Sequence, residues 1–136
     1  MKFKYKKFGQ TLRPVIQIRV NNADTFLGYE VLIDSGADFS LFHAEIAEAL
    51  GIDLEKCKKG IVTGVGGKSS EYFLHTIGVE VGGWVFDMEV GFLPTIGGRA
   101  APYGIVGQKD FFEHFRITFD YKGGDIELKP KESGKK

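Results

Sequence analysis

A carboxylate, a hydroxyl and a glycine stand side by side at Asp34, Ser35 and Gly36, directly after an apolar run at 31–33. A buried strand that ends here would fix the carboxylate in place, and the glycine would let other backbone approach it. The hydroxyl can hydrogen-bond locally and hold the turn. A carboxylate held in this way can act as an acid or a base. The same tripeptide is also ordinary turn composition, so the elements around it must decide between the two interpretations.

Two predicted strands lead up to the acid. Leu12 to Val20 alternates apolar and polar side chains, which predicts a strand with one face in water. Residues 21–24 have turn composition, and Thr25 to Ile33 reads as the returning strand. The resulting hairpin would deliver Asp34 at the end of its second strand.

A short helix is expected soon after the acid. His43 to Leu50 consists mainly of helix formers, and Gly51 is a natural stop. We expect the side chain of His43, at the helix start, to be exposed or to cap the helix. Further ligands at metal-like spacing do not follow, so the sequence predicts no metal site.

Glycines at 64, 66 and 67 suggest a phosphate-binding loop, but the spacing does not fit. The pattern G-x-x-x-x-G-K-[ST] requires a glycine where this chain has Val62. A dinucleotide-binding pattern also fails, because no helix is expected to follow. Glu71 to Val81 instead reads as a strand, so we predict a long hairpin with a glycine-rich tip.

The rest of the chain alternates strands and turns. Residues 84–92 read as a strand and 93–104 as a loop, and Gln108 to Phe115 carries phenylalanines at helical spacing that we interpret as core residues. A final hairpin is predicted around the turn at 122–124. Many short strands with two short helices predict a mostly-β barrel or sandwich.

Composition narrows the choice of function. The 136 residues are 43% hydrophobic, which is enough for one domain, placed at 1–129, before a disordered lysine-rich tail at 130–136. The net charge is zero, so we expect neither nucleic-acid nor membrane partners, and we expect the lysines near both ends to be solvated.

The single cysteine, Cys57, excludes an internal disulfide and is taken as a structural or incidental thiol. A reducing compartment and the lack of a signal-length apolar run predict a cytoplasmic protein.

This order of elements resembles the retropepsin-like aspartic proteases, the single-domain family of retroviral proteases and their cellular relatives, over roughly Val15 to Leu128. Leu32-Ile33-Asp34-Ser35-Gly36-Ala37 matches the catalytic loop of that family. Residues 63–69 lie where the tip of the flap should be. Ile105-Val106-Gly107 matches the apolar-apolar-glycine segment, and a short helix at 109–115 follows as expected.

The resemblance implies a closed acid-protease barrel that works as a two-fold dimer on an extended peptide or protein, without a cofactor. Asp34 would carry the chemistry with Ser35 and Gly36 in its loop, and Ser35 would help to lock that loop to its symmetry mate. Gly107 would support the loop from behind. The residues implied to bind substrate lie after the catalytic glycine, in the flap and in the apolar-apolar-glycine segment: Ala37, Asp38, Gly64, Val65, Gly66, Gly67, Ile105 and Val106.

The chemistry itself requires a second chain. An aspartic protease needs two carboxylates that share one proton, because like charges about 3 Å apart cannot both ionise. One then acts as base on a water while the other polarises the scissile carbonyl. Only one Asp-Ser-Gly is present, so its partner must be Asp34 of a second copy across a two-fold axis.

One departure from the viral pattern keeps an alternative open. Viral members usually have an Arg after the apolar-apolar-glycine segment that pairs with an acid, whereas this chain has Gln108 and Asp38. Arg13 or Arg19 is a candidate for the missing charge-assisted bond. The alternatives to a peptidase are a catalytically silent peptide-binding or dimerisation module of the same fold, and an unrelated small β-barrel binder in which Asp-Ser-Gly is only a turn.

Overall fold

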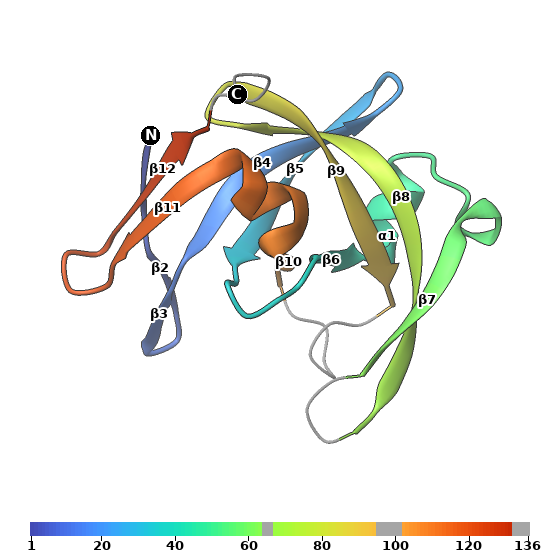
Figure 1. The fold of residues 1–136 in the computed structure, drawn as a ribbon, viewed down its shortest axis with the longest axis horizontal. Coiled ribbons are helices and arrows are strands. Elements are labelled where there is room, and N and C mark those ends of the chain that lie inside the picture. Colours follow the sequence, from blue (N-terminus) through green and yellow to red (C-terminus); the bar gives the residue numbers. More distant parts are fainter. Residues whose placement is uncertain (64–66, 95–101, 132–136) are drawn as a thin grey trace.

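A six-stranded closed barrel forms the body of the protein (Figure 1). We describe residues 1–63, 67–94 and 102–131 of a computed structural model. The barrel strands follow the order β4-β5-β10-β6-β9-β8, and pairing of β4 with β8 closes the ring. They are β4 (Val15–Asn22), β5 (Thr25–Ile33), β6 (Ser40–His43), β8 (Ser69–Val81), β9 (Trp84–Leu93) and β10 (Gly104–Val106). The predicted mostly-β barrel is confirmed.

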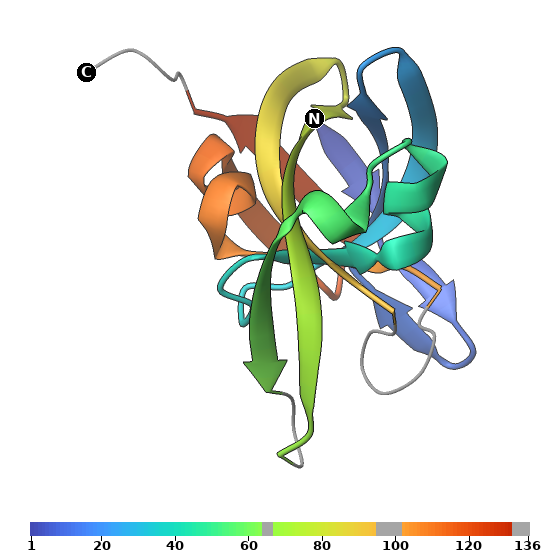
Figure 2. The same cartoon turned by 90° about the vertical axis from the view of Figure 1, so that its right-hand side faces the viewer.

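The remaining elements surround this barrel. They are β1 (Lys2–Lys4), β2 (Lys6–Phe8), β3 (Thr11–Arg13), β7 (Lys58–Thr63), β11 (Phe115–Asp120), β12 (Asp125–Pro130), α1 (Ala44–Ala49) and the helical turns η1 (Leu54–Lys56) and η2 (Gln108–Phe112). The hairpin β7–β8 pairs from Lys58↔Leu74 to Thr63↔Ser69 and extends away from the barrel (Figure 2). Of its tip, residues 64–66 lie outside the described part of the chain.

The predicted hairpin is confirmed as β4–β5, although Leu12 and Arg13 belong to β3 and the turn is shorter than the predicted 21–24. Its strands pair from Val15↔Leu32 to Asn22↔Thr25, so the turn falls at Ala23 and Asp24. Apolar side chains of β4 enter the core while Gln17 and Arg19 face water. The alternation read from the sequence therefore specifies which face of this strand is buried.

His43 is buried, contrary to prediction. Only 8% of the residue is exposed, and its Nδ1 atom lies 2.6 Å from the Tyr29 hydroxyl. It makes no side-chain cap of α1, although it does precede the first residue of that helix. The reason is its place at the end of β6, inside the barrel wall between β10 and β9.

The predicted short helix at 109–115 is present, but it is interrupted. It consists of η2 followed by two further helical residues, Glu113 and His114, and β11 begins at Phe115. Asp110 interrupts the segment with φ 69° and ψ −54°, a strained γ-turn conformation for a residue with a side chain. Phe111 and Phe115 are buried as core residues, as the sequence indicated.

Both ends of the described chain belong to one sheet, in the order β1-β12-β11. The lysines of β1 are exposed, as expected, but they lie on an ordered strand, and Lys4 pairs with Asp125 at 2.8 Å. β12 includes Pro130, and the Lys131 amide donates to the His114 carbonyl oxygen at 2.8 Å. Residues 132–136 of the predicted tail lie outside the described part. None of the described helices is long and apolar enough to cross a membrane.

Candidate active site

Asp34 stands immediately after the last residue of β5 and is half-buried. Its amide donates to the carbonyl oxygen of Val106 at 3.0 Å. β10 runs parallel to β5 with Val106 opposite Ile33, so the backbone of Asp34 is fixed by its hydrogen bond to the end of β10. The position of this carboxylate is therefore set by two strands far apart in the sequence.

The loop after Asp34 folds back onto the acid. The Gly36 amide donates to Asp34 Oδ1 at 2.9 Å, and the Ala37 amide donates to the Asp34 carbonyl oxygen at 3.2 Å. Ser35 and Gly36 are exposed. One carboxylate oxygen thus has a fixed backbone donor, which restricts how the carboxyl group can rotate.

The segment that follows β10 lies against this loop. The Gln108 amide donates to Ala37 O at 2.8 Å, and the Lys109 amide donates to Asp38 O at 2.9 Å. The Gly107 amide donates to the buried hydroxyl of Ser40 at 3.1 Å. A side chain at Gly107 would place its Cβ 2.5 Å from Ala37 O, so this close approach requires glycine.

The residues predicted to bind substrate differ in exposure. Asp38 is exposed, and Ala37 and Ile105 are half-buried. Val106 is completely buried in the core, so direct contact with a substrate is compatible with Ile105 and not with Val106. Gly67 lies beside the flap tip with φ 78°, whereas Gly64, Val65 and Gly66 are outside the described residues.

A pocket of about 510 Å³ opens next to Asp38, and the sequence did not predict it. It lies between the segment after the catalytic loop, the base of the flap and the polar contacts around η2. Its lining residues are Asp38, Phe39, Lys58, Tyr72, Leu74, Glu89 and Lys109. The rings of Phe39 and Tyr72 meet with centroids 5.1 Å apart.

Two glycines make room for the Tyr72 ring. Gly60 is its partner across the β7–β8 pair, and a Cβ there would lie 2.3 Å from the ring. A Cβ at Gly91 would lie 3.2 Å from the same ring. Gly60 and Gly91 are the only features of the sequence that could have indicated this pocket. They could not be interpreted from the sequence, because which side chain lies opposite each glycine depends on strand register.

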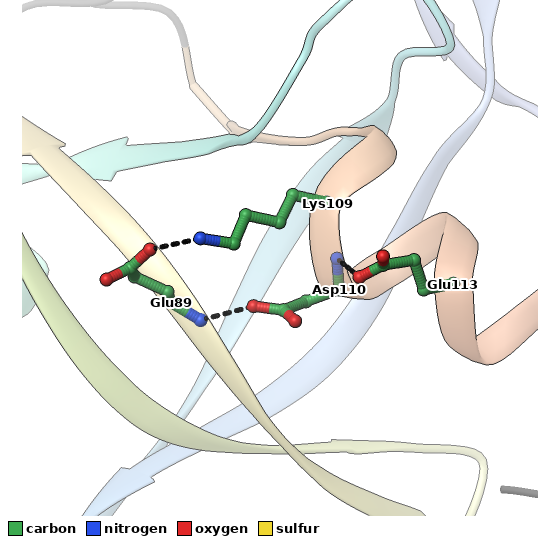
Figure 3. Close-up of polar contacts among 4 residues, drawn as sticks. All are labelled: Glu89, Lys109, Asp110 and Glu113. Atoms are coloured by element: carbon green, nitrogen blue, oxygen red, sulfur yellow. Dashed lines mark hydrogen bonds and ion pairs between the residues drawn. The ribbon is translucent and has the colours of Figure 1, made fainter.

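Polar contacts fix η2 to β9 beside the pocket (Figure 3). The ammonium of Lys109 lies 2.6 Å from Glu89 Oε1, and the Glu89 amide donates to Asp110 Oδ2 at 2.8 Å. The Asp110 amide donates to Glu113 Oε1 at 2.7 Å. The hydrogen bond and ion pair to Glu89 raise the pKa of Lys109 above its usual value.

Neither arginine considered from the sequence contacts Asp38 within the described chain. Arg13 donates to the hydroxyl of Tyr103, and Arg19 pairs with Glu80 at 3.6 Å. Gln108 instead contacts the loop after Asp34, because its Nε2 donates to Ser35 O at 2.8 Å.

Cys57 and His75 form a further polar contact among the described residues. The Cys57 sulfur lies 3.9 Å from Nδ1 of His75, a contact that could not be seen from their positions in the sequence. Burial, and then the negative charge of Asp53, raise the pKa of this thiol. A raised pKa keeps the sulfur protonated and weakly nucleophilic. No three metal-ligating side chains gather among the described residues.

Residues 16–109 match the aspartyl protease family. The chain therefore belongs to that family, and its fold is the retropepsin-like one. It is similar to a retropepsin-like aspartic protease from Rickettsia conorii, with a TM-score of 0.68 and 19% identity over 94% of this chain and 89% of that one. It is also similar to the EIAV protease complexed with the inhibitor HBY-793, with a TM-score of 0.52 and 21% identity over 76% of this chain and 88% of that one. No curated protein matches the chain.

Proposed function

We propose that this protein is a homodimeric aspartic endopeptidase. The observation that carries the proposal is the placement of Asp34: the acid of the family motif directly follows β5, its amide donates to Val106 O, and one of its carboxylate oxygens accepts from the Gly36 amide. Two such carboxylates across a two-fold axis would share one proton. One activates a water for attack on the peptide carbonyl, and the other protonates the developing oxyanion.

The dimer contact is expected at the end of the barrel that carries the Asp34 loop. The terminal strands pair within one chain, as β1-β12-β11, so their central strand is already occupied on both sides. The loop after β5, the hairpin β2–β3 and the flap hairpin β7–β8 all lie toward one end of the barrel (Figure 1). We propose that a second copy docks at this end, which would bring the two Asp34 residues together.

The substrate is an extended peptide held by β-like pairing beneath the flap. Phe39, Tyr72 and Leu74 give the pocket beside Asp38 an apolar floor with two aromatic rings. We propose that it accepts a large apolar or aromatic side chain of the substrate, because such a ring can pack on Phe39 and Tyr72.

A digestion assay tests the activity. A denatured protein substrate is incubated at mildly acidic pH with wild type, with Asp34→Asn and with Asp24→Asn as a control at an exposed turn acid. We expect cleavage by wild type and by the control, and none by Asp34→Asn, because an amide cannot share the proton. Cleavage that survives Asp34→Asn would overturn the proposal.

The effect of dilution on activity distinguishes a dimeric enzyme from a monomeric one. Because the site is complete only in the dimer, activity per chain should rise with protein concentration and level off when dimerisation is complete. Activity per chain that stays constant on dilution, in a protein that sediments as a monomer, would exclude the shared site.

A silent peptide-binding module remains the second candidate, favoured by Gln108 at a position where viral members usually have Arg. It predicts a folded dimer that binds peptides and leaves them intact at every pH. Fluorescence anisotropy with a labelled peptide, run beside the digestion assay, distinguishes binding without cleavage from the absence of both.

A further inference from the structure

A single peptide unit joins Gln108 to the catalytic carboxylate. The carbonyl of Ser35 and the amide of Gly36 belong to the same planar unit. At one end, Gln108 Nε2 donates to Ser35 O at 2.8 Å; at the other, Gly36 N donates to Asp34 Oδ1 at 2.9 Å. The side chain of Gln108 therefore holds the group that in turn holds Asp34.

We propose that Gln108 is a positioning residue for the Asp34 carboxylate, acting through the Ser35–Gly36 peptide unit. The inference rests on the proposed peptidase function for its catalytic consequence, but its geometry does not depend on activity. Fixing the carbonyl end stops the plane from rotating, so the amide stays aimed at Asp34 Oδ1. A donor on the carbonyl also polarises the unit and strengthens the bond that its amide donates.

Gln108 is itself held firmly enough to act in this way. Its backbone amide donates to Ala37 O at 2.8 Å, and the next amide, of Lys109, donates to Asp38 O at 2.9 Å. Beyond it, Asp110 is kept in its strained conformation by the Glu89 amide, which donates to Asp110 Oδ2 at 2.8 Å (Figure 3). Strained residues persist where the surroundings fix them, often beside functional sites. η2 thus connects β9 rigidly to the catalytic loop.

A neutral amide suits this position. Gln108 supplies an N–H donor without a formal charge next to a carboxylate pair that must hold exactly one proton between its two members. The charged residues beside Gln108 in sequence are Lys109, which is paired with Glu89 at 2.6 Å, and Asp110, which accepts from the Glu89 amide at 2.8 Å; those in the loop that it contacts are Asp34 and Asp38. The Gln108 amide can therefore orient the loop without adding a charge that would change how the two Asp34 carboxylates share their proton.

The first test observes the peptide unit directly and needs no turnover. The Gly36 amide is followed by NMR and hydrogen exchange in wild type, Gln108→Ala, Gln108→Glu and Gln17→Ala. Gln17 is an exposed glutamine on β4, opposite Glu30, and serves as the control. We expect an upfield shift and faster exchange of the Gly36 amide in Gln108→Ala, with thermal unfolding unchanged within a few degrees, and wild-type behaviour in the control.

Gln108→Glu gives a signature that a merely structural role would not produce. An ionised carboxylate cannot donate to Ser35 O, whereas a protonated one can. At neutral pH this variant should resemble Gln108→Ala, and the Gly36 amide should return toward its wild-type shift as the pH falls to about 4. A Gly36 amide that is the same in all four proteins at every pH would overturn the proposal.

The second test is kinetic. Gln108→Ala should lower kcat by about tenfold to a hundredfold with KM changed less than about threefold, because the substrate still binds while the acid is misplaced. Wild-type kcat in Gln108→Ala would refute the positioning role and leave the peptidase intact. Absence of cleavage by wild type would instead refute the peptidase, and the NMR result would still decide whether Gln108 holds the loop.

Discussion

Gly107 lies so close to Ala37, in the loop after Asp34, that a Cβ at this residue would come within 2.5 Å of the Ala37 carbonyl oxygen. The same Cβ would also be 2.7 Å from Phe39 O. Both obstacles are backbone atoms, which cannot move aside as the end of a flexible side chain can. The tight contact lets the amides of Gln108 and Lys109 bond to the loop that carries Asp34.

We therefore predict that Gly107→Ala destabilises the fold by about 1–3 kcal/mol, the usual range for overpacking a well-packed site. Gly28→Ala is the matched control, because the one close contact of its Cβ would be with the end of the Gln17 side chain, which can rotate away. That control should change stability by less than about 0.5 kcal/mol. Urea unfolding measures both, and equal effects would show that the backbone contact at Gly107 is unimportant.

The buried pair of Tyr29 and His43 leads to a second prediction. The Tyr29 hydroxyl bonds to His43 Nδ1 at 2.6 Å and accepts from the His43 amide at 3.1 Å. Tyr29→Phe leaves both groups without this partner in the core and should cost about 1–3 kcal/mol. Tyr121→Phe, at an exposed tyrosine, should be neutral by the same unfolding measurement. Burial raises the pKa of Tyr29 far above its usual value, so we expect this phenol to stay protonated at alkaline pH values where an exposed tyrosine ionises.

Cys57 should react slowly with thiol reagents at neutral pH. Burial, and then the negative charge of Asp53, raise the pKa of its thiol, so the reactive thiolate is scarce until the solution becomes alkaline. Reaction with a disulfide reagent should accelerate steeply above pH 9, and also at neutral pH once urea unfolds the chain. A rate at pH 7 equal to that of the unfolded protein would contradict this prediction.

The pocket beside Asp38 should control which side chains the substrate can present. Tyr72→Ala removes half of the aromatic pair, and Gly60→Val would drive a branched side chain into the Tyr72 ring. Profiling of cleavage in a peptide library should show loss of preference for large apolar residues at one substrate position in both variants. Val85→Ala, at an exposed residue of β9, is the control. An unchanged profile would mean that the pocket takes no substrate side chain.

Local patterns were enough to predict much of this protein. The alternation of β4, the stop after α1 at Gly51 and the final hairpin follow from side-chain periodicity and from glycine, and these are properties of neighbouring residues. The order of the Asp-Ser-Gly loop and the apolar-apolar-glycine segment pointed to the family that the match over residues 16–109 then showed.

Only the tertiary structure decided how these pieces meet. Gln108 reaches Ser35 across 73 positions of the sequence, and the bond depends on the parallel pairing of β10 with β5. The burial of His43, the room that Gly60 leaves for Tyr72 and the strained turn at Asp110 depend in the same way on neighbours brought together by strand register. Periodicity tells which face of a strand is buried; it does not tell which residue of another strand lies opposite, because that is fixed by closure of the barrel.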